Sequence, residues 1–128
     1  MIHLPVLVVL LNVLLLFATG LVVASARGRH GVKAPATVGH PDFERAFRIQ
    51  MNTLEWMPII LPALWLFAVY ISDSIAAGIG AIWIIGRIVY FIGYSKAAAK
   101  RGPGFMIQGI AAIALWAGAL GAVVLRMV

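Results

Sequence analysis

Four stretches of this 128-residue chain are each long and apolar enough to cross a lipid bilayer as an α-helix. They cover residues 4–26, 43–70, 75–101 and 105–126. Hydrophobic residues make up 63% of the chain and charged residues 11%, which excludes a water-soluble domain of this length. The sequence therefore predicts an all-α membrane protein, in which residues 1–128 form a single domain, a four-helix transmembrane bundle.

Short polar segments predict where the helices begin and end. The first stretch has no Lys or Arg ahead of it and is longer than the apolar region of a signal peptide, about 7–15 residues, so we expect a retained transmembrane helix. Asp42 suits the N-cap of the second helix, and Pro58 and Pro62 should bend that helix. The Gly-Pro-Gly sequence at residues 102–104 separates the third helix from the fourth.

Basic residues are concentrated at one end of the predicted bundle. The loop after the first helix and the end of the third helix carry Arg27, Arg29, Lys33, Arg45, Lys96, Lys100 and Arg101. The opposite end carries His3, Asp73 and Arg126. Because basic loops stay on the cytoplasmic side of a membrane, we expect the basic end to be cytoplasmic and both termini to lie outside.

The composition excludes several kinds of chemistry. The chain has no cysteine, so a disulfide, a thiolate metal site and a cysteine nucleophile are excluded, and any thiol must come with a ligand. His3, His30 and His40 lack the spacing of metal ligands, and we expect no metal site. The net charge of +6 lies among apolar helices, which argues against nucleic acid as a partner.

Polar and charged side chains nevertheless occur inside two of the apolar stretches. At about 100° per residue, the second helix carries three of them within an arc of about 60°: Arg48, Asn52 and Glu55. The third helix carries four in one narrow stripe: Arg87, Tyr90, Tyr94 and Arg101. An ionisable side chain at membrane depth costs at least about 2.5–3.5 kcal/mol on insertion scales, so such groups usually mark a functional site.

These two stripes meet at the basic end if the helices are antiparallel, and together they predict a net-cationic pocket. The arginines outnumber Glu55 three to one, and burying unpaired cations is costly, so we expect an anionic ligand to complete the site. A small molecule with several carboxylates and one amine would suit it, with arginines binding the acids and Glu55 the ammonium. A structural alternative stays open, in which Glu55 pairs with an arginine, Arg101 is an interfacial anchor and the tyrosines belong to an aromatic belt.

Two segments of the chain resemble a known family. Residues 43–55 (FERAFRIQMNTLE) and 87–94 (RIVYFIGY) are similar to the MAPEG family, the membrane-associated proteins in eicosanoid and glutathione metabolism. Its members include microsomal glutathione transferases, a cysteinyl-leukotriene synthase and a lipoxygenase-activating protein, and the chain looks like a bacterial-type member. The resemblance implies a homotrimer of four-helix subunits that binds glutathione, as co-substrate and without a metal, between neighbouring subunits.

The resemblance also implies roles for individual residues. The glutathione contacts would be Arg48, Asn52, Glu55, Arg87, Tyr90 and Tyr94, with Gln50 and Arg27 as further candidates. Arg101 matches an arginine that holds the thiolate in synthase-like members, whereas Lys96 and Lys100 have weaker claims. Trp56 stands where those members have a tyrosine that contacts glutathione, so the contact at this position must differ.

The implied function is a membrane-bound glutathione transferase, with peroxidase activity and a role in detoxification. Arg101 would favour the thiolate, since a cation lowers the pKa of a thiol from about 8.5. The thiolate would attack lipophilic electrophiles or hydroperoxides dissolved in the membrane lipids. One alternative is a non-catalytic lipid-binding scaffold of the same family. Another is a small four-helix exporter, which would require a carboxylate in the first helix, where the chain has only Asn12.

Overall fold

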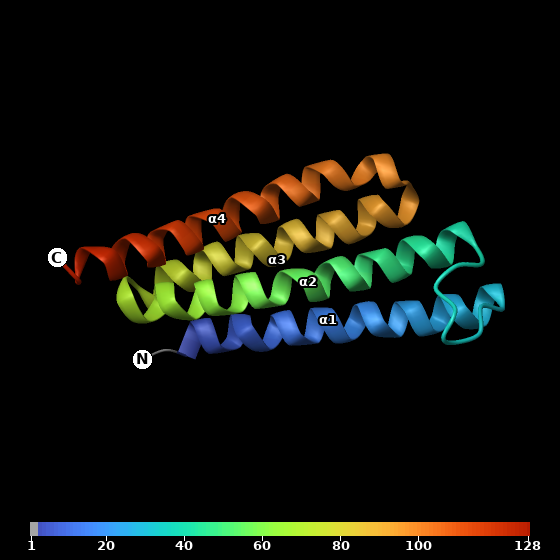
Figure 1. Ribbon diagram of the computed structural model, residues 1–128, viewed down its shortest axis with the longest axis horizontal. Helices are drawn as coiled ribbons and strands as arrows, with labels where there is room; N and C mark the ends of the chain where they lie inside the picture. Colours follow the sequence, from blue (N-terminus) through green and yellow to red (C-terminus); the bar gives the residue numbers. More distant parts are fainter. Residues whose placement is uncertain (1–2) are drawn as a thin grey trace.

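The computed structural model describes residues 3–128, and its helices run alternately up and down, so that the start of α1 and the C-terminus lie at the same end of the bundle (Figure 1). The elements are α1 (His3–His30), α2 (Pro41–Tyr70), α3 (Asp73–Lys96), the short 3-10 helix η1 (Ala98–Arg101) and α4 (Gly102–Leu125). Within the described residues, four helices are long and apolar enough to cross a membrane, the last counted from Ala98 to Leu125. The all-helical, four-span prediction is confirmed.

The start of α2 differs from the prediction. The helix begins at Pro41 rather than residue 43, and its N-cap is His40, not Asp42. The His40 Nδ1 accepts a hydrogen bond from the Asp42 N–H at 3.1 Å. Proline at the first helical position has no N–H that would need a partner, so the helix can start one residue after the histidine. Asp42 instead lies in the first turn, where a carboxylate interacts favourably with the helix dipole.

The third helix also ends earlier than predicted. α3 stops at Lys96 because Ala97 is extended (φ −163°, ψ 143°) and closes the last turn with its N–H on the Gly93 carbonyl. The chain then folds back so closely that a Cβ on Gly93 would collide with the Lys100 carbonyl oxygen. Arg101 therefore belongs to η1 and not to the stripe of the third helix. The prediction of one helix over residues 75–101 was wrong at its end.

Helices α3 and α4 approach each other through glycines. A Cβ built on Gly86 would lie 2.6 Å from the Gln108 backbone nitrogen, and one on Gly104 would lie 2.7 Å from the Gly86 carbonyl oxygen. Contacts this close leave no room for any side chain, and small residues are how membrane helices reach such short separations. The pair α3–α4 is consequently a tightly packed hairpin, and η1 forms its tip.

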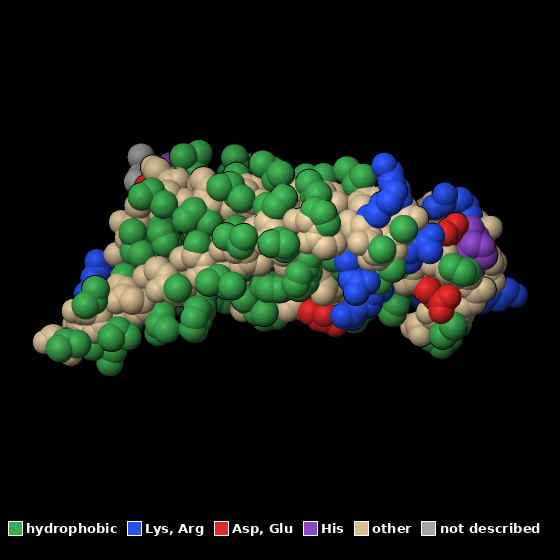
Figure 2. Space-filling model, turned by 90° about the horizontal axis from the view of Figure 1, so that it is seen from above, with side chains coloured by type: hydrophobic (Ala, Val, Ile, Leu, Met, Phe, Trp, Pro, Cys, Tyr) green, Lys and Arg blue, Asp and Glu red, His purple; other side chains and the backbone are tan. Residues whose placement is uncertain are grey.

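The bundle has an apolar outer surface and one basic end. Apolar side chains cover most of the length of the molecule, while Lys and Arg gather toward the end that carries the loop between α1 and α2 (Figure 2). The basic end comprises Arg27, Arg29, Lys33, Arg45, Lys96, Lys100 and Arg101. Such a surface suits a lipid environment with one charged rim.

Candidate functional site

A cavity of about 320 Å³ opens at the basic end, between α2 and the α3–α4 hairpin. Five polar side chains and one aromatic ring line it: Arg48, Asn52, Tyr90, Tyr94, Arg101 and Phe105. Both predicted polar stripes thus contribute to one cavity. Among the residues that the structure describes, the lining contains two guanidinium groups and no carboxylate. Counting Glu55, the carboxylate partner of Arg48, the site still carries a net positive charge that can hold an anion.

The α2 wall of the cavity carries an ion pair. Arg48 donates from Nη1 and Nη2 to the two carboxylate oxygens of Glu55, at 3.0 and 3.3 Å. The two residues are two helical turns apart, which brings long side chains on one face within reach. Both side chains are about half exposed in the single chain. Glu55 therefore has a guanidinium partner before any ligand arrives, as the structural alternative supposed.

Arg87 does not line the cavity, contrary to expectation. It is buried to 2% exposure and donates to Asn52 Oδ1 at 2.8 Å, Thr53 Oγ1 at 2.6 Å and Gln108 Oε1 at 3.3 Å. All three acceptors are neutral. They come from α2 and α4, and thus Arg87 ties α3 to both neighbouring helices. Neutral oxygens thus accept hydrogen bonds from both Nη atoms of this guanidinium, while its buried Nε has no partner among the described residues.

The buried guanidinium of Arg87 nevertheless lies directly behind the cavity wall. Its Cζ is 4.2 Å from the centroid of the Tyr90 ring, and Tyr90 is one of the lining residues. This is cation–π distance. Tyr90 thus separates the buried charge from the cavity, and its ring packs at 5.5 Å from that of Tyr94.

Arg101 lies at the rim of the cavity. Its guanidinium carbon is 5.6 Å from the centroid of the Tyr94 ring, and its Nη1 donates to the Ala98 carbonyl at 3.2 Å. The side chain is exposed, so it can reorient toward a bound molecule. Its position follows from η1, which places the last residue of the turn over Tyr94.

Two predicted ligand contacts lie elsewhere in the chain. Arg27 folds over the loop after α1, donating to the Ala36 carbonyl at 2.7 Å and lying 4.7 Å from the centroid of the Phe43 ring. Gln50 faces α1, where a Cβ on Gly20 would come within 3.2 Å of its Nε2. Neither residue lines the cavity of the same chain.

The sequence reasoning missed the contributions of α4. Phe105 lines the cavity and packs against Tyr90 at 6.3 Å and against Trp56 at 5.9 Å, both between ring centroids. Trp56 itself faces an apolar hollow of about 240 Å³ shared with Trp116, rather than the polar cavity. Gln108 is the other omission, although a single amide in an otherwise apolar helix was a usable signal.

These features define a four-helix membrane protein with an arginine- and tyrosine-lined cavity at its basic end. The chain matches the MAPEG family over residues 5–121 and belongs to that family. It is 46% identical to an uncharacterized protein of Synechocystis sp. over 116 residues, which cover 91% of this chain and 85% of that protein.

Two further relatives carry functional names. The chain is 44% identical to microsomal glutathione S-transferase 2 of Homo sapiens over 100 residues, 77% of this chain and 68% of that protein. It is 42% identical to leukotriene C4 synthase of Cavia porcellus over 94 residues, 73% of this chain and 63% of that protein. The family of this chain thus includes a microsomal glutathione transferase.

Proposed function

We propose that this protein is a membrane glutathione transferase, which joins the sulfur of glutathione to lipophilic electrophiles. The observation that carries the proposal is the cavity at the basic end, whose lining offers two arginines and no acid. Glutathione is a tripeptide with two carboxylates, one ammonium and one thiol. In a chain without cysteine, a thiol brought by the ligand supplies the nucleophile.

Each polar group of the site has a role in this proposal. Arg48 binds a carboxylate of glutathione as a charged donor, and Glu55, its present partner, meets the ammonium. Asn52 uses its Oδ1 for Arg87, and consequently offers its amide N–H groups to the ligand. Tyr90 and Tyr94 provide the walls and their hydroxyls.

Arg101 activates the thiol. A guanidinium beside the sulfur stabilises the thiolate, which is the nucleophilic form. The thiolate attacks the electrophilic carbon and forms a thioether. In a substitution, the bond to the leaving group breaks and that group departs as an anion with the electron pair; in an addition, the anion formed takes a proton. Hydroperoxides are a second class of acceptor: the thiolate attacks an oxygen, the O–O bond breaks to release an alcohol after protonation, and a second glutathione converts the sulfenic acid to a disulfide and water. Phe105 borders both the polar cavity and Trp56 of the apolar hollow, a short path for an acceptor that arrives from lipid.

The site is completed by neighbouring subunits of a homotrimer in this proposal. Gln50 faces α1 and Arg27 folds over the loop after α1, so in this proposal they act on the cavity of another copy. Glu55 lies about 15 Å along α2 from Arg45 at the basic end, which places it at membrane depth. Its ion pair with Arg48 is nevertheless half exposed on the single chain. Lipid solvates such a pair poorly, and a neighbouring copy with bound glutathione would cover it. We place the basic end in the cytoplasm and both termini outside.

Conjugation by the purified protein tests the proposal. The protein in detergent is mixed with glutathione and a chloronitrobenzene, and the absorbance of the conjugate is followed. We expect turnover that saturates with glutathione. Glutathione binding without turnover on any electrophile would instead support the non-catalytic scaffold, and absence of binding would reject both.

The trimer has its own measurement. Native mass spectrometry of the protein released from detergent is expected to show a mass of three chains of 13.7 kDa each. A monomer or dimer at concentrations where conjugation is measured would remove the argument that Arg27 and Gln50 act across subunits.

Replacing Glu55 by glutamine should weaken glutathione binding about tenfold, because a charge-assisted contact with the ammonium becomes a neutral one. Calorimetric titration with glutathione measures the change. Glu44→Gln, which removes a carboxylate from the first turn of the same helix, is the matched control and should bind normally. Equal affinity in Glu55→Gln would leave Glu55 with only a structural role toward Arg48.

A further inference from the structure

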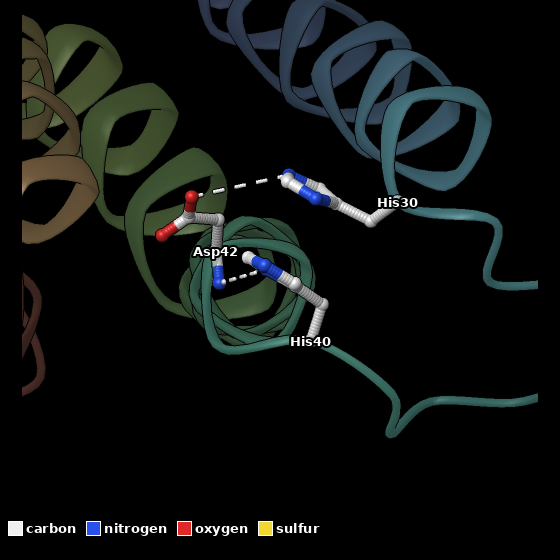
Figure 3. Close-up of side chains that lie close together, drawn as sticks. All are labelled: His30, His40 and Asp42. Carbon is white, nitrogen blue, oxygen red and sulfur yellow. Dashed lines mark hydrogen bonds and ion pairs between the residues drawn. The ribbon is translucent and has the colours of Figure 1, made fainter.

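A second cluster of side chains lies away from the cavity, where α1 ends and α2 begins. His30 is the last residue of α1, His40 is the N-cap of α2, and Asp42 is in the first turn of α2 (Figure 3). One potential ligand atom from each lies within 4.8 Å of the other two. The two histidines are not on one helix, and therefore their spacing along the chain gave no indication of a metal site.

The conformation of the loop between α1 and α2 is held by contacts of other residues, and it places His30 close to His40 and Asp42. Val32 is buried against Val23, Ala26 and Phe43, and its N–H donates to the Arg27 carbonyl at 3.1 Å. Arg27 in turn donates to the Ala36 carbonyl across the loop. The fold itself thus brings the two imidazoles together before any ligand binds.

The donor set is characteristic of a transition metal. Two imidazole nitrogens and one carboxylate oxygen are the ligands that zinc accepts, with a fourth position left for water. We propose that His30, His40 and Asp42 bind one divalent transition-metal ion, of the zinc class, at the junction of α1 and α2. This site is independent of the glutathione cavity and of the function proposed for it.

The geometry shows what must move when the metal binds. The two imidazole rings are stacked, with centroids 3.7 Å apart and planes 14° apart, and the His30 Nε2 is 3.9 Å from a carboxylate oxygen of Asp42. Lone pairs of an imidazole lie in its plane, so one ring must rotate for both nitrogens to converge on an ion. A cavity of about 250 Å³ lined by His30 and Asp42 provides room for that rotation and for a water ligand.

Two features oppose metal binding, so the ion must bind strongly to imidazole. His40 Nδ1 accepts a hydrogen bond from the Asp42 N–H, and a metal on this ring would replace that helix cap. Arg29 lines the adjoining cavity and Arg45 pairs with Asp42, and both repel a cation. Hard ions such as Mg²⁺ and Ca²⁺ gain little from imidazole, and hence Zn²⁺, Cu²⁺ and Ni²⁺ are favoured over them.

Metal titration of tag-free, chelator-treated protein tests the site. Calorimetry with Zn²⁺ is expected to give one ion per chain, and Mg²⁺ should give no heat of binding. His30→Ala and His40→Asn should each lower the Zn²⁺ affinity by at least about 10- to 100-fold, the loss seen when even an outer partner of a metal ligand is removed. His3→Ala, a histidine at the opposite end, should bind like the unmodified protein.

The choice of His40→Asn separates ligand loss from unfolding. Asparagine is a strong N-cap and a poor zinc ligand, so α2 should keep its start and the metal-free variant should melt at the unmodified temperature. Cu²⁺ bound to the unmodified protein should show electron paramagnetic coupling to two nitrogens, and to one in His30→Ala. Absence of stoichiometric Zn²⁺ binding would overturn the proposal. So would a Zn²⁺ affinity in His30→Ala and in His40→Asn that equals that of the unmodified protein.

Discussion

Replacing Arg101 by alanine is expected to lower kcat for glutathione conjugation by about 100-fold or more, the loss typical of a removed group that stabilises developing or reactive charge. Glutathione affinity should change only a few fold, because Arg48 and Asn52 still line the cavity. Steady-state rates with varied glutathione and a saturating chloronitrobenzene give both quantities. The defect should shrink as the pH rises toward and past about 8.5, where a free thiol ionises without help.

Lys100→Ala is the matched control for this change. Lys100 is the cation immediately before Arg101 in η1, but it does not line the cavity, so its loss should leave kcat nearly unchanged. Arg101→Lys should recover part of the rate, since it keeps the charge and loses the planar guanidinium. A rate unaffected by Arg101→Ala, or a defect of equal size at every pH, would remove Arg101 from thiol activation.

Gly104→Ala is expected to destabilise the protein by about 1–3 kcal/mol or more, the usual cost of overpacking a filled interior. The added methyl group would collide with the Tyr90 backbone and lie 2.7 Å from the Gly86 carbonyl oxygen. The atoms that the methyl group would meet belong to the backbone, which cannot adopt another rotamer as a side chain can, so α3 and α4 must separate. Because Tyr90 and Phe105 lie on the two helices that move, glutathione binding should be lost together with stability.

Thermal unfolding in detergent, followed by circular dichroism, measures the effect of Gly104→Ala. Gly109→Ala is the control on the same helix, because a Cβ at that position meets nothing within 4 Å. Its melting temperature should match or exceed that of the unmodified protein, since alanine is the better helix former. If the melting temperature of Gly104→Ala equals that of the Gly109→Ala control, the α3–α4 contact tolerates a methyl group.

Helical periodicity was sufficient to predict the α2 side of the cavity. Arg48 and Asn52 are one helical turn apart, and an unbroken helix fixes their common direction from local geometry alone. Helical periodicity also predicted that Tyr90 and Tyr94 lie on one face of α3, and both line the cavity. Their roles toward glutathione stay predictions, because periodicity fixes direction but says nothing of what binds.

Features that depend on contacts between helices could not be read in this way. Arg87 shares the stripe of Tyr94, but its Nη atoms donate to oxygens of Thr53 and Gln108 in the core, and these acceptors come from other helices. The early end of α3 depends on the close approach of Lys100 to Gly93. The meeting of His30 with His40 depends on the closure of a loop.

The hydrogen bond from Arg87 to Asn52 also affects which groups of Asn52 are left for a molecule in the cavity. With Oδ1 engaged in the core, the carboxamide turns only its hydrogens outward. The side-chain nitrogens of Arg48, Asn52 and Arg101 in the lining then act as hydrogen-bond donors. The phenol oxygens of Tyr90 and Tyr94 can also act as acceptors. A cation that entered the cavity would have to take the Glu55 carboxylate from Arg48, with which it is already paired. A side chain buried in the core thereby sets the hydrogen-bonding character of a cavity wall that it does not itself line.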